Sequence, residues 1–239
     1  MKYFIISDIH GHYKEMRSAL RKAGYRKTDE NSILVVLGDI FDRGSECVKV
    51  YRFLRSIPKN RRVLIRGNHE FFLKVITERG YLLSADINNG TANTIEQFVK
   101  NFYPGLKFNS LVQPFINTGV VQWIFSDEWV NYWECDNLLF VHSWIPYEGF
   151  YCRENWRDAS FYAWMSATLA CPWKMIQVCT VPEDKIIVCG HWKTSDFRTA
   201  LDGAPADNND NSTYIGEKIV GLDSCVYKSG FCNVLVLEK

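Results

Sequence analysis

The 239-residue sequence predicts an α/β layered fold, because the same local pattern occurs three times in its first third. In each repeat, a short apolar run typical of a buried strand is followed by a segment with apolar residues at helical spacing. The strands are expected at 3–9, 32–38 and 62–66. Strands that alternate with helices favour layers in which helices cover a sheet.

Each of the three strands is followed by an expected helix. The first spans 13–23 and ends at Gly24, which suits the end of a helix. The second spans 45–57 and ends before Pro58. The third begins directly after the third strand and continues to residue 79.

The second half of the chain is less regular. The aromatic-rich segment 111–135 is compatible with helix or strand. No linker or internal repeat divides the chain, so a single domain over 1–239 is expected. The other expected elements are helices over 94–102 and 159–169, strands over 138–141 and 185–189, and a β meander formed by 212–216, 218–222 and 231–237.

Composition and charge limit the possible classes of protein. Hydrophobic residues make up 47% and charged residues 23%, which is typical of a globular protein. The net charge of +1 gives no overall attraction to nucleic acid or a membrane, so neither partner is expected. No apolar run is long enough for a membrane span or a signal peptide. The eight cysteines show no Cys-x-x-Cys spacing, and we expect free thiols in a reduced, cytoplasmic protein.

Polar and charged residues gather where the expected strands end. Ligands bind at the carboxyl ends of strands in open α/β sheets, so these side chains are expected to share one cleft. Each residue alone would be an ordinary turn former or a histidine without a ligand, but their coincidence at five strand ends favours a common site. The set is Asp8, His10, Asp39, Asp42, Arg43, Asn68, His69, His142 and His191.

The chemistry of these side chains points to metal ions. Imidazoles, carboxylates and a carboxamide without a thiolate suit Mn²⁺, Fe²⁺ or Zn²⁺ better than a structural zinc cage. Six candidate ligands are too many for one catalytic ion and fit two ions that share a carboxylate. Such a pair can stabilise the attacking and leaving oxygens of an in-line displacement.

The order of the motifs resembles that of the calcineurin-like metallophosphoesterases. It is similar to the bacterial and phage members of the phosphoprotein phosphatase branch, which are lambda phosphatase-like. Asn88-Asn89-Gly90-Thr91 is also similar to an Asn-Gly-Gly stretch of that branch. The motifs, in chain order, are Asp8-x-His10, Gly38-Asp39-x-x-Asp42-Arg43-Gly44, Gly67-Asn68-His69-Glu70, His142 and Gly190-His191.

The resemblance implies a central β-sandwich flanked by helices, with a dimetal site at the C-terminal ends of the strands. Two divalent ions are implied, with Mn²⁺ expected first and Fe or Zn as alternatives. The first ion would be held by Asp8, His10 and Asp39, and the second by Asp39, Asn68, His142 and His191. A hydroxide bridging the ions would attack phosphorus. His69, oriented by Asp42, would protonate the leaving group, and Arg43 would bind the phosphoryl oxygens.

One departure from the branch concerns a second phosphate-binding arginine. In the Trp164–Thr168 segment, Thr168 stands where that arginine is expected. Arg153, Arg157 or Lys174 could take its place. The aromatic residues between 123 and 173 are expected mainly to pack the core or a cap.

The expected function is a metal-dependent phosphomonoesterase of the serine/threonine protein phosphatase type. Its substrate would be a phosphoprotein carrying phosphoserine or phosphothreonine, or a small phosphoester. Two alternatives stay open: a symmetrical dinucleoside-polyphosphate hydrolase, and a non-catalytic phosphate-binding relative.

Overall fold

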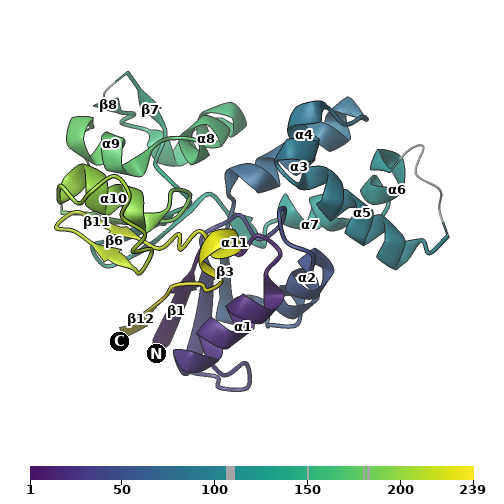
Figure 1. The fold of residues 1–239 in the computed structure, drawn as a ribbon, viewed down its shortest axis with the longest axis horizontal. Coiled ribbons are helices and arrows are strands. Elements are labelled where there is room, and N and C mark those ends of the chain that lie inside the picture. The colour runs from purple at the N-terminus through teal and green to yellow at the C-terminus, as the bar shows by residue number, and fades with distance from the viewer. Residues whose placement is uncertain (106–110, 150, 180, 182–183) are drawn as a thin grey trace.

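Two five-stranded sheets form the centre of the molecule (Figure 1). The structure is a computed structural model, and it describes residues 1–105, 111–149, 151–179, 181 and 184–239. The two chain termini lie side by side, with the terminal ammonium of Met1 donating to the carbonyl of Lys239.

The first sheet contains the three strands predicted near the N-terminus. Its inner strands are parallel, and one strand from the C-terminus pairs antiparallel with β1 at the edge. The strand order is β12 (Val234–Glu238), β1 (Lys2–Ile6), β2 (Ser32–Val36), β3 (Arg62–Ile65) and β4 (Trp129–Val130).

The second sheet has a parallel centre, formed by β6, β9 and β11, and an antiparallel strand at each edge. Its order is β10 (Tyr214–Ile215), β11 (Ile219–Gly221), β9 (Ile186–Cys189), β6 (Leu138–Val141) and β5 (Tyr132–Cys135). A separate ribbon pairs β7 (Tyr147–Glu148) with β8 (Tyr151–Cys152).

The two sheets pack face to face as the expected sandwich. Ile5 and Val35 of the first sheet share a buried cluster with Phe140 and Val188 of the second. Their neighbours in sequence, such as Phe4, point to the opposite face and pack under helices. This alternation follows from the two-residue period of a strand and buries both faces of the first sheet.

Helices cover the outer faces of the sandwich. Figure 1 shows α8, α9 and α10 beside the second sheet and α3 to α7 as a separate helical layer. The bounds are α1 (Tyr13–Lys22), α2 (Cys47–Arg55), α3 (Asn68–Arg79), α4 (Ser84–Asn88), α5 (Thr91–Phe102), α6 (Val112–Ile116), α7 (Val120–Ile124), α8 (Phe161–Thr168), α9 (Pro172–Val178), α10 (Thr194–Leu201) and α11 (Val226–Ser229), with 3-10 turns at Lys59–Arg61 and Trp156–Asp158.

The predicted C-terminal β meander is wrong. Of the three strands expected in the meander, only β10 and β11 pair with each other. The chain then forms the short helix α11 and crosses to the first sheet. There β12 pairs with β1, and Leu235 and Leu237 pack into the core between the sheets. An apolar alternation indicates a strand but not its partner, which is why the crossing was missed.

The segment left open at 111–135 contains both kinds of element, namely α6, α7, β4 and β5. Its aromatic residues and those that follow are mainly packing residues, as expected. Trp144, Trp156 and Trp164 are almost completely buried, and the last stacks on Tyr132 with ring centroids 5.6 Å apart.

The eight cysteines are free thiols. No helix in the described ranges is long and apolar enough to cross a membrane.

Candidate dimetal and phosphate site

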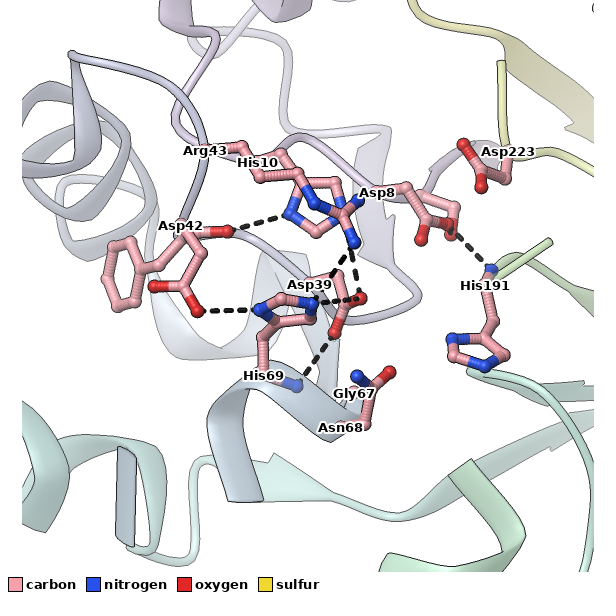
Figure 2. A network of polar contacts seen from close by, with 12 residues as sticks. Asp8, His10, Asp39, Asp42, Arg43, Gly67, Asn68, His69, His191 and Asp223 are labelled. Carbon is pink, nitrogen blue, oxygen red and sulfur yellow. Dashed lines mark hydrogen bonds and ion pairs between the residues drawn. The ribbon is translucent and has the colours of Figure 1, made fainter. Parts of the chain in front are cut away.

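The strand ends of both sheets meet at one place and bring the nine predicted residues together. Figure 2 labels all of them except His142, whose Nε2 lies 3.5 Å from Oδ2 of Asp39. The loop after β1 supplies Asp8 and His10, and the loop after β2 supplies Asp39, Asp42 and Arg43. Asn68 and His69 open helix α3, whereas His142 and His191 follow β6 and β9. The site therefore lies where the two sheets of the sandwich meet.

The backbone of the site is in an unusual conformation. Six of its residues have a positive φ, between 45° and 69°, and they are Asp8, His10, Asp39, Asp42, Arg43 and His191. This left-handed conformation costs roughly 1–2 kcal/mol for a residue with a side chain. Such residues cluster at functional sites, where the surrounding structure holds them in place.

Two glycines allow the carboxylates to approach neighbouring loops closely. A Cβ at Gly67 would overlap Oδ1 of Asp39, and a Cβ at Gly190 would overlap Oδ2 of Asp8. These motif glycines are therefore needed for the space they leave free.

Asp39 lies at the centre of the site. Its Oδ2 is 3.7 Å from Nε2 of His10, 3.8 Å from Nε2 of His69 and 3.5 Å from Nε2 of His142. Its Oδ1 accepts a hydrogen bond from the backbone N–H of His69 at 3.1 Å. One carboxylate thus faces donor atoms on both sides, as a ligand shared by two ions must.

A second group of donor atoms surrounds His142. Its Nε2 lies 3.0 Å from Oδ1 of Asn68 and 3.3 Å from Nδ1 of His191. Together with Asp39, these residues offer carboxylate, carboxamide and imidazole donors around one point.

Two imidazoles are held in the tautomer that a metal needs. The Nδ1–H of His10 donates to the carbonyl of Phe41 at 2.9 Å, and that of His142 donates to the carbonyl of Leu37 at 2.6 Å. Each ring therefore presents the lone pair of Nε2 to the site. Burial also lowers the pKa of both rings and lowers that of His191 to about 3, so all three are in the neutral, ligating form.

The carboxylates indicate that a cation belongs here. Oδ1 of Asp8 is buried without a hydrogen-bond partner in the described part of the chain. Burial raises the pKa of Asp8, and the nearby charges of Asp223 and Asp39 raise it further. A bound cation would relieve the repulsion between these acids and would use the unpaired oxygen of Asp8, so the residues fit divalent ions. In the structure, the Arg43 guanidinium contacts Nε2 of His10.

His69 and Asp42 form a pair beside the metal ligands. Nδ1 of His69 lies 2.6 Å from Oδ2 of Asp42, and Thr91 and Thr94 of helix α5 each donate to Asp42 at 2.6 Å. Burial alone would lower the pKa of His69, but Asp39 and Asp42 outweigh burial and raise the pKa above 6.5. The ring is therefore suited to hold a proton near neutral pH.

The geometry leaves two ways to complete the first metal cluster. Donor atoms of His10, Asp39 and His69 lie within 4.8 Å of one another, as do those of Asp39, His142 and His191. The family resemblance instead gives Asp8 to the first cluster. We favour Asp8, because its unpartnered oxygen is available and because His69 is already paired with Asp42.

Glu70 has a structural role that its place in the Gly67–Glu70 motif did not reveal. Its carboxylate accepts three backbone hydrogen bonds, from Asp39 N at 2.8 Å, Ile40 N at 3.1 Å and Gly67 N at 2.7 Å. It thereby fixes the loop that carries Asp39 against the start of α3.

Two residues from the last part of the chain were also missed. Asp223 follows β11 and accepts from the backbone N–H of Cys225 at 2.7 Å. The second residue is Tyr227, whose ring lies 5.1 Å from the guanidinium carbon of Arg43. The position of Asp223 at a strand end was a usable signal, whereas nothing local pointed to Tyr227.

The proposed replacements for the second arginine have other contacts. Arg153 pairs with Glu148 at 3.7 Å, Arg157 pairs with Glu134 at 2.7 Å, and Lys174 lies over the Trp173 ring. Thr168 itself is buried and donates to the carbonyl of Met165. Within the described ranges, none of these contacts reaches the site, and Arg43 is the guanidinium that faces it.

Comparison with known families and curated proteins gives two kinds of match. The family model described as "Calcineurin-like phosphoesterase" matches residues 1–220. A symmetrical bis(5'-nucleosyl)-tetraphosphatase of Buchnera aphidicola subsp. Schizaphis graminum is 38% identical over 73 residues, which are 30% of this chain and 26% of that protein. The asymmetrical bis(5'-nucleosyl)-tetraphosphatase PrpE of Bacillus velezensis is 42% identical over 76 residues, 29% of this chain and 30% of that protein. The matches thus span less than a third of either relative.

Solved structures resemble this chain over nearly its whole length. A putative diadenosine tetraphosphatase has a TM-score of 0.53 at 13% identity, with 99% of this chain and 92% of that one covered. A Saccharomyces cerevisiae protein serine/threonine phosphatase has a TM-score of 0.54 at 15% identity, with 93% and 67% covered. At such low identity, the likeness is one of fold.

Proposed function

Because this chain belongs to the calcineurin-like phosphoesterase family, we propose that it hydrolyses a dinucleoside polyphosphate with the help of two divalent ions. The observation that carries the reaction type is the convergence of six ligand side chains, five of them buried, with Arg43 and His69 at one group of strand ends. The substrate class is supported by the two relatives named as tetraphosphatases.

This proposal reverses the order of the sequence-based expectations. The phosphoprotein phosphatase expected first is supported by a likeness of fold, whereas the dinucleoside-polyphosphate hydrolase is supported by sequence identity. The non-catalytic alternative has less support, because the acid–base pair is present beside the ligands.

Six residues of the site would hold the metal ions. When bound, two divalent ions would supply a nucleophile at neutral pH and neutralise charge on the phosphoryl group. One ion would be held by Asp8, His10 and Asp39, and the other by Asp39, Asn68, His142 and His191. Manganese is the first ion to test, and iron and zinc are alternatives.

His69 and Arg43 would act directly on the substrate. His69 would donate its proton to the leaving oxygen, and Asp42 would hold the ring in position and favour its protonated form. The planar guanidinium of Arg43 would bind two phosphoryl oxygens and stabilise their charge as the bond to the leaving group breaks.

The test is a substrate panel with Mn²⁺, Fe²⁺ or Zn²⁺ added to the metal-free protein. We expect faster turnover of diadenosine tetraphosphate than of a phosphoserine peptide or p-nitrophenyl phosphate. Faster turnover of the peptide would instead support the phosphoprotein phosphatase expected from the sequence. No turnover of any substrate with any of the ions would contradict the enzyme proposal. The Asp39→Asn variant, expected to lose both ions and all turnover, controls for contaminating phosphatases.

A further inference from the structure

A second charged feature lies outside the dimetal site, between helices α1 and α2. We call it the α1–α2 groove; its volume is about 440 Å³, and its main lining residues are Tyr13, Arg17, Lys27, Lys49, Arg52 and Phe53. A second hollow of about 330 Å³ shares Tyr13 and Arg17 and adds Lys14 and Arg21. The two hollows thus form one surface along α1, and the ten residues of that helix span about 15 Å.

The groove is strongly basic, although the whole chain has a net charge of only +1. Six lysine or arginine side chains line its two hollows, and no acidic side chain does so among the described residues. Lys49 pairs with Glu46 at 2.7 Å. The Glu46 carboxylate also accepts from the backbone N–H of Lys14 at 3.3 Å. The charged ends of the other five side chains have no carboxylate oxygen within 4.0 Å in the described ranges.

The existing contacts hold three of these cations without neutralising them. Arg17 lies 4.5 Å over the Phe53 ring, and Arg52 donates to Oδ1 of Asn101 at 3.1 Å. Lys27 donates to the hydroxyl of Ser56 at 3.1 Å. Positively charged groups that are placed by neutral partners keep their attraction for an anion.

The chemistry of the groove suits phosphate groups. Three of its six cations are arginines, whose planar guanidinium groups bind phosphate oxygens in pairs. Proteins that bind single-stranded nucleic acid also present aromatic rings on which bases stack. Here Phe53 is 7% exposed and covered by Arg17, and Tyr13 meets it edge to face at 6.2 Å. The groove thus offers dense positive charge, and the Phe53 ring is covered by one of its cations.

The groove is close to the dimetal site but separate from it. The backbone N–H of Gly44 donates to the carbonyl of His10 at 2.9 Å, and that of Glu46 donates to the carbonyl of Gly11 at 3.0 Å. The same two loops therefore begin α1 and α2 and carry His10 and Arg43. None of the groove residues belongs to the nine residues of the site.

We propose that the α1–α2 groove binds a linear chain of phosphate groups, either inorganic polyphosphate or the phosphate chain of a nucleotide. The dense charge of such a chain matches the six cations of the groove, of which three lie on α1, two on α2 and one in the loop after α1, and the chain needs no stacking of bases. This binding needs no metal and no turnover, so it does not depend on the proposed function.

The test measures binding to the metal-free full chain by calorimetry, with EDTA present so that no hydrolysis occurs. The probes are medium-chain inorganic polyphosphate and adenosine tetraphosphate. The groove variant combines Arg17→Gln and Arg52→Gln. Its matched control combines Lys22→Gln and Arg55→Gln, which remove the same charge from exposed positions of the same helices outside the groove.

We expect the groove variant to weaken binding at least about tenfold and the control to change it less than about twofold. Binding of both probes, or of inorganic polyphosphate alone, would indicate a site for the phosphate chain itself. Binding of adenosine tetraphosphate alone would indicate the nucleotide as its source. Both results would support the proposal if the groove variant weakens them.

Four results would overturn the proposal. The first is that neither probe binds. The second is that the groove and control variants weaken binding equally, which would indicate only a general charge effect, and the third is that Arg43→Ala abolishes binding while the groove variant does not, which would place the ligand in the dimetal site. The fourth is equal, groove-dependent binding of poly-uridylate or poly-aspartate, which would show that phosphate density is not recognised.

Discussion

Nδ1 of His69 lies 2.6 Å from Oδ2 of Asp42, in a buried pair that two threonines of α5 hold from the other side. The carboxylate belongs to the loop after β2 and the imidazole to the start of α3, so the pair joins two strand ends. Because Asp42 has two further hydrogen bonds, its position does not depend on His69. This arrangement fixes the ring and favours its protonated form.

The first prediction concerns the pH dependence of this pair. Asp39 and Asp42 raise the pKa of His69, so the ring keeps its proton to higher pH than an ordinary histidine. Asp42→Asn removes one of the two charges and should therefore lower that pKa. The alkaline limb of turnover on a substrate with a poor leaving group should therefore move to lower pH. A pH–rate profile with metal ions in excess measures it.

Thr91→Val is the matched control, because it removes one hydrogen bond to Asp42 and keeps the charge. Its alkaline limb should move less than that of Asp42→Asn. An unchanged limb in Asp42→Asn would show that His69 does not supply the proton.

The second prediction separates the two possible roles of His69. As a general acid, His69→Asn should retain both ions and lower turnover about 10²–10⁴-fold on a substrate with an alkoxide leaving group. Loss should be smaller on diadenosine tetraphosphate, whose leaving group is a more stable phosphate. Elemental analysis and turnover of both substrates measure these effects. His12→Asn, at a half-buried histidine outside both ligand groups, should change neither.

Loss of one ion in His69→Asn would instead make His69 a ligand of the first cluster, in place of Asp8. Equal loss of turnover on both substrates, with both ions retained, would contradict the acid role.

The third prediction concerns Glu70, which accepts backbone hydrogen bonds on both carboxylate oxygens. In Glu70→Gln, an NH₂ group must face a backbone N–H, so one buried bond is lost and two donors oppose each other. We expect the free energy of unfolding to fall by roughly 1–3 kcal/mol. Metal affinity should fall as well, because the Asp39 loop loosens. Chemical denaturation and metal titration measure the two effects.

Glu78→Gln serves as the control for that change. It lies on the same helix, with an exposed side chain paired to Lys74 at 3.0 Å. Such a surface pair contributes little, so stability should change by less than about 1 kcal/mol. Undiminished metal affinity in Glu70→Gln would show that the carboxylate does not position Asp39.

Much of the fold and most of the candidate site were predictable because the signals are local. Apolar runs specify β1 to β3, and a polar residue directly after a strand is visible without a structure. The partner of a strand is not local, so the pairing of β12 with β1 and the approach of Tyr227 to Arg43 were missed. Thr91 and Thr94 were missed for the same reason, since their contact with Asp42 depends on how α5 packs.

The fourth prediction concerns the close approach at Gly190. A Cβ there would overlap Oδ2 of Asp8 and the hydroxyl of Ser7. Gly190→Ala should therefore displace Asp8 and lower the affinity of the first ion, even where the chain stays folded. Metal content per chain measures this effect. Gly203→Ala is the control: its φ of 71° makes it strained by about 1 kcal/mol, but nothing lies within 4 Å of a Cβ there. It should lose stability and keep its ions, and full metal content in Gly190→Ala would contradict the argument.

The fifth prediction concerns Tyr227, whose ring lies 5.1 Å from the guanidinium carbon of Arg43. Arg43 is exposed, so without this ring its long side chain would occupy more rotamers before it binds a phosphoryl group. An exposed cation–π contact is worth about 0.5–1 kcal/mol, which corresponds to a rise in KM of about two- to fivefold in Tyr227→Leu. Turnover at saturating substrate should change less, because the contact orients Arg43 and does not touch the leaving group.

Tyr227→Phe keeps the ring and should keep KM. Tyr162→Leu is the control: it removes an exposed tyrosine of a different helix, α8, and should change neither KM nor turnover at saturating substrate. Steady-state kinetics of the three variants with one substrate separate the possibilities. Equal effects in Tyr227→Phe and Tyr227→Leu would assign the role to the hydroxyl and not to the ring. A rise in KM that persists in the Arg43→Ala background would show that Tyr227 contacts the substrate independently, because a residue that acts only by orienting Arg43 can have no further effect once Arg43 is absent.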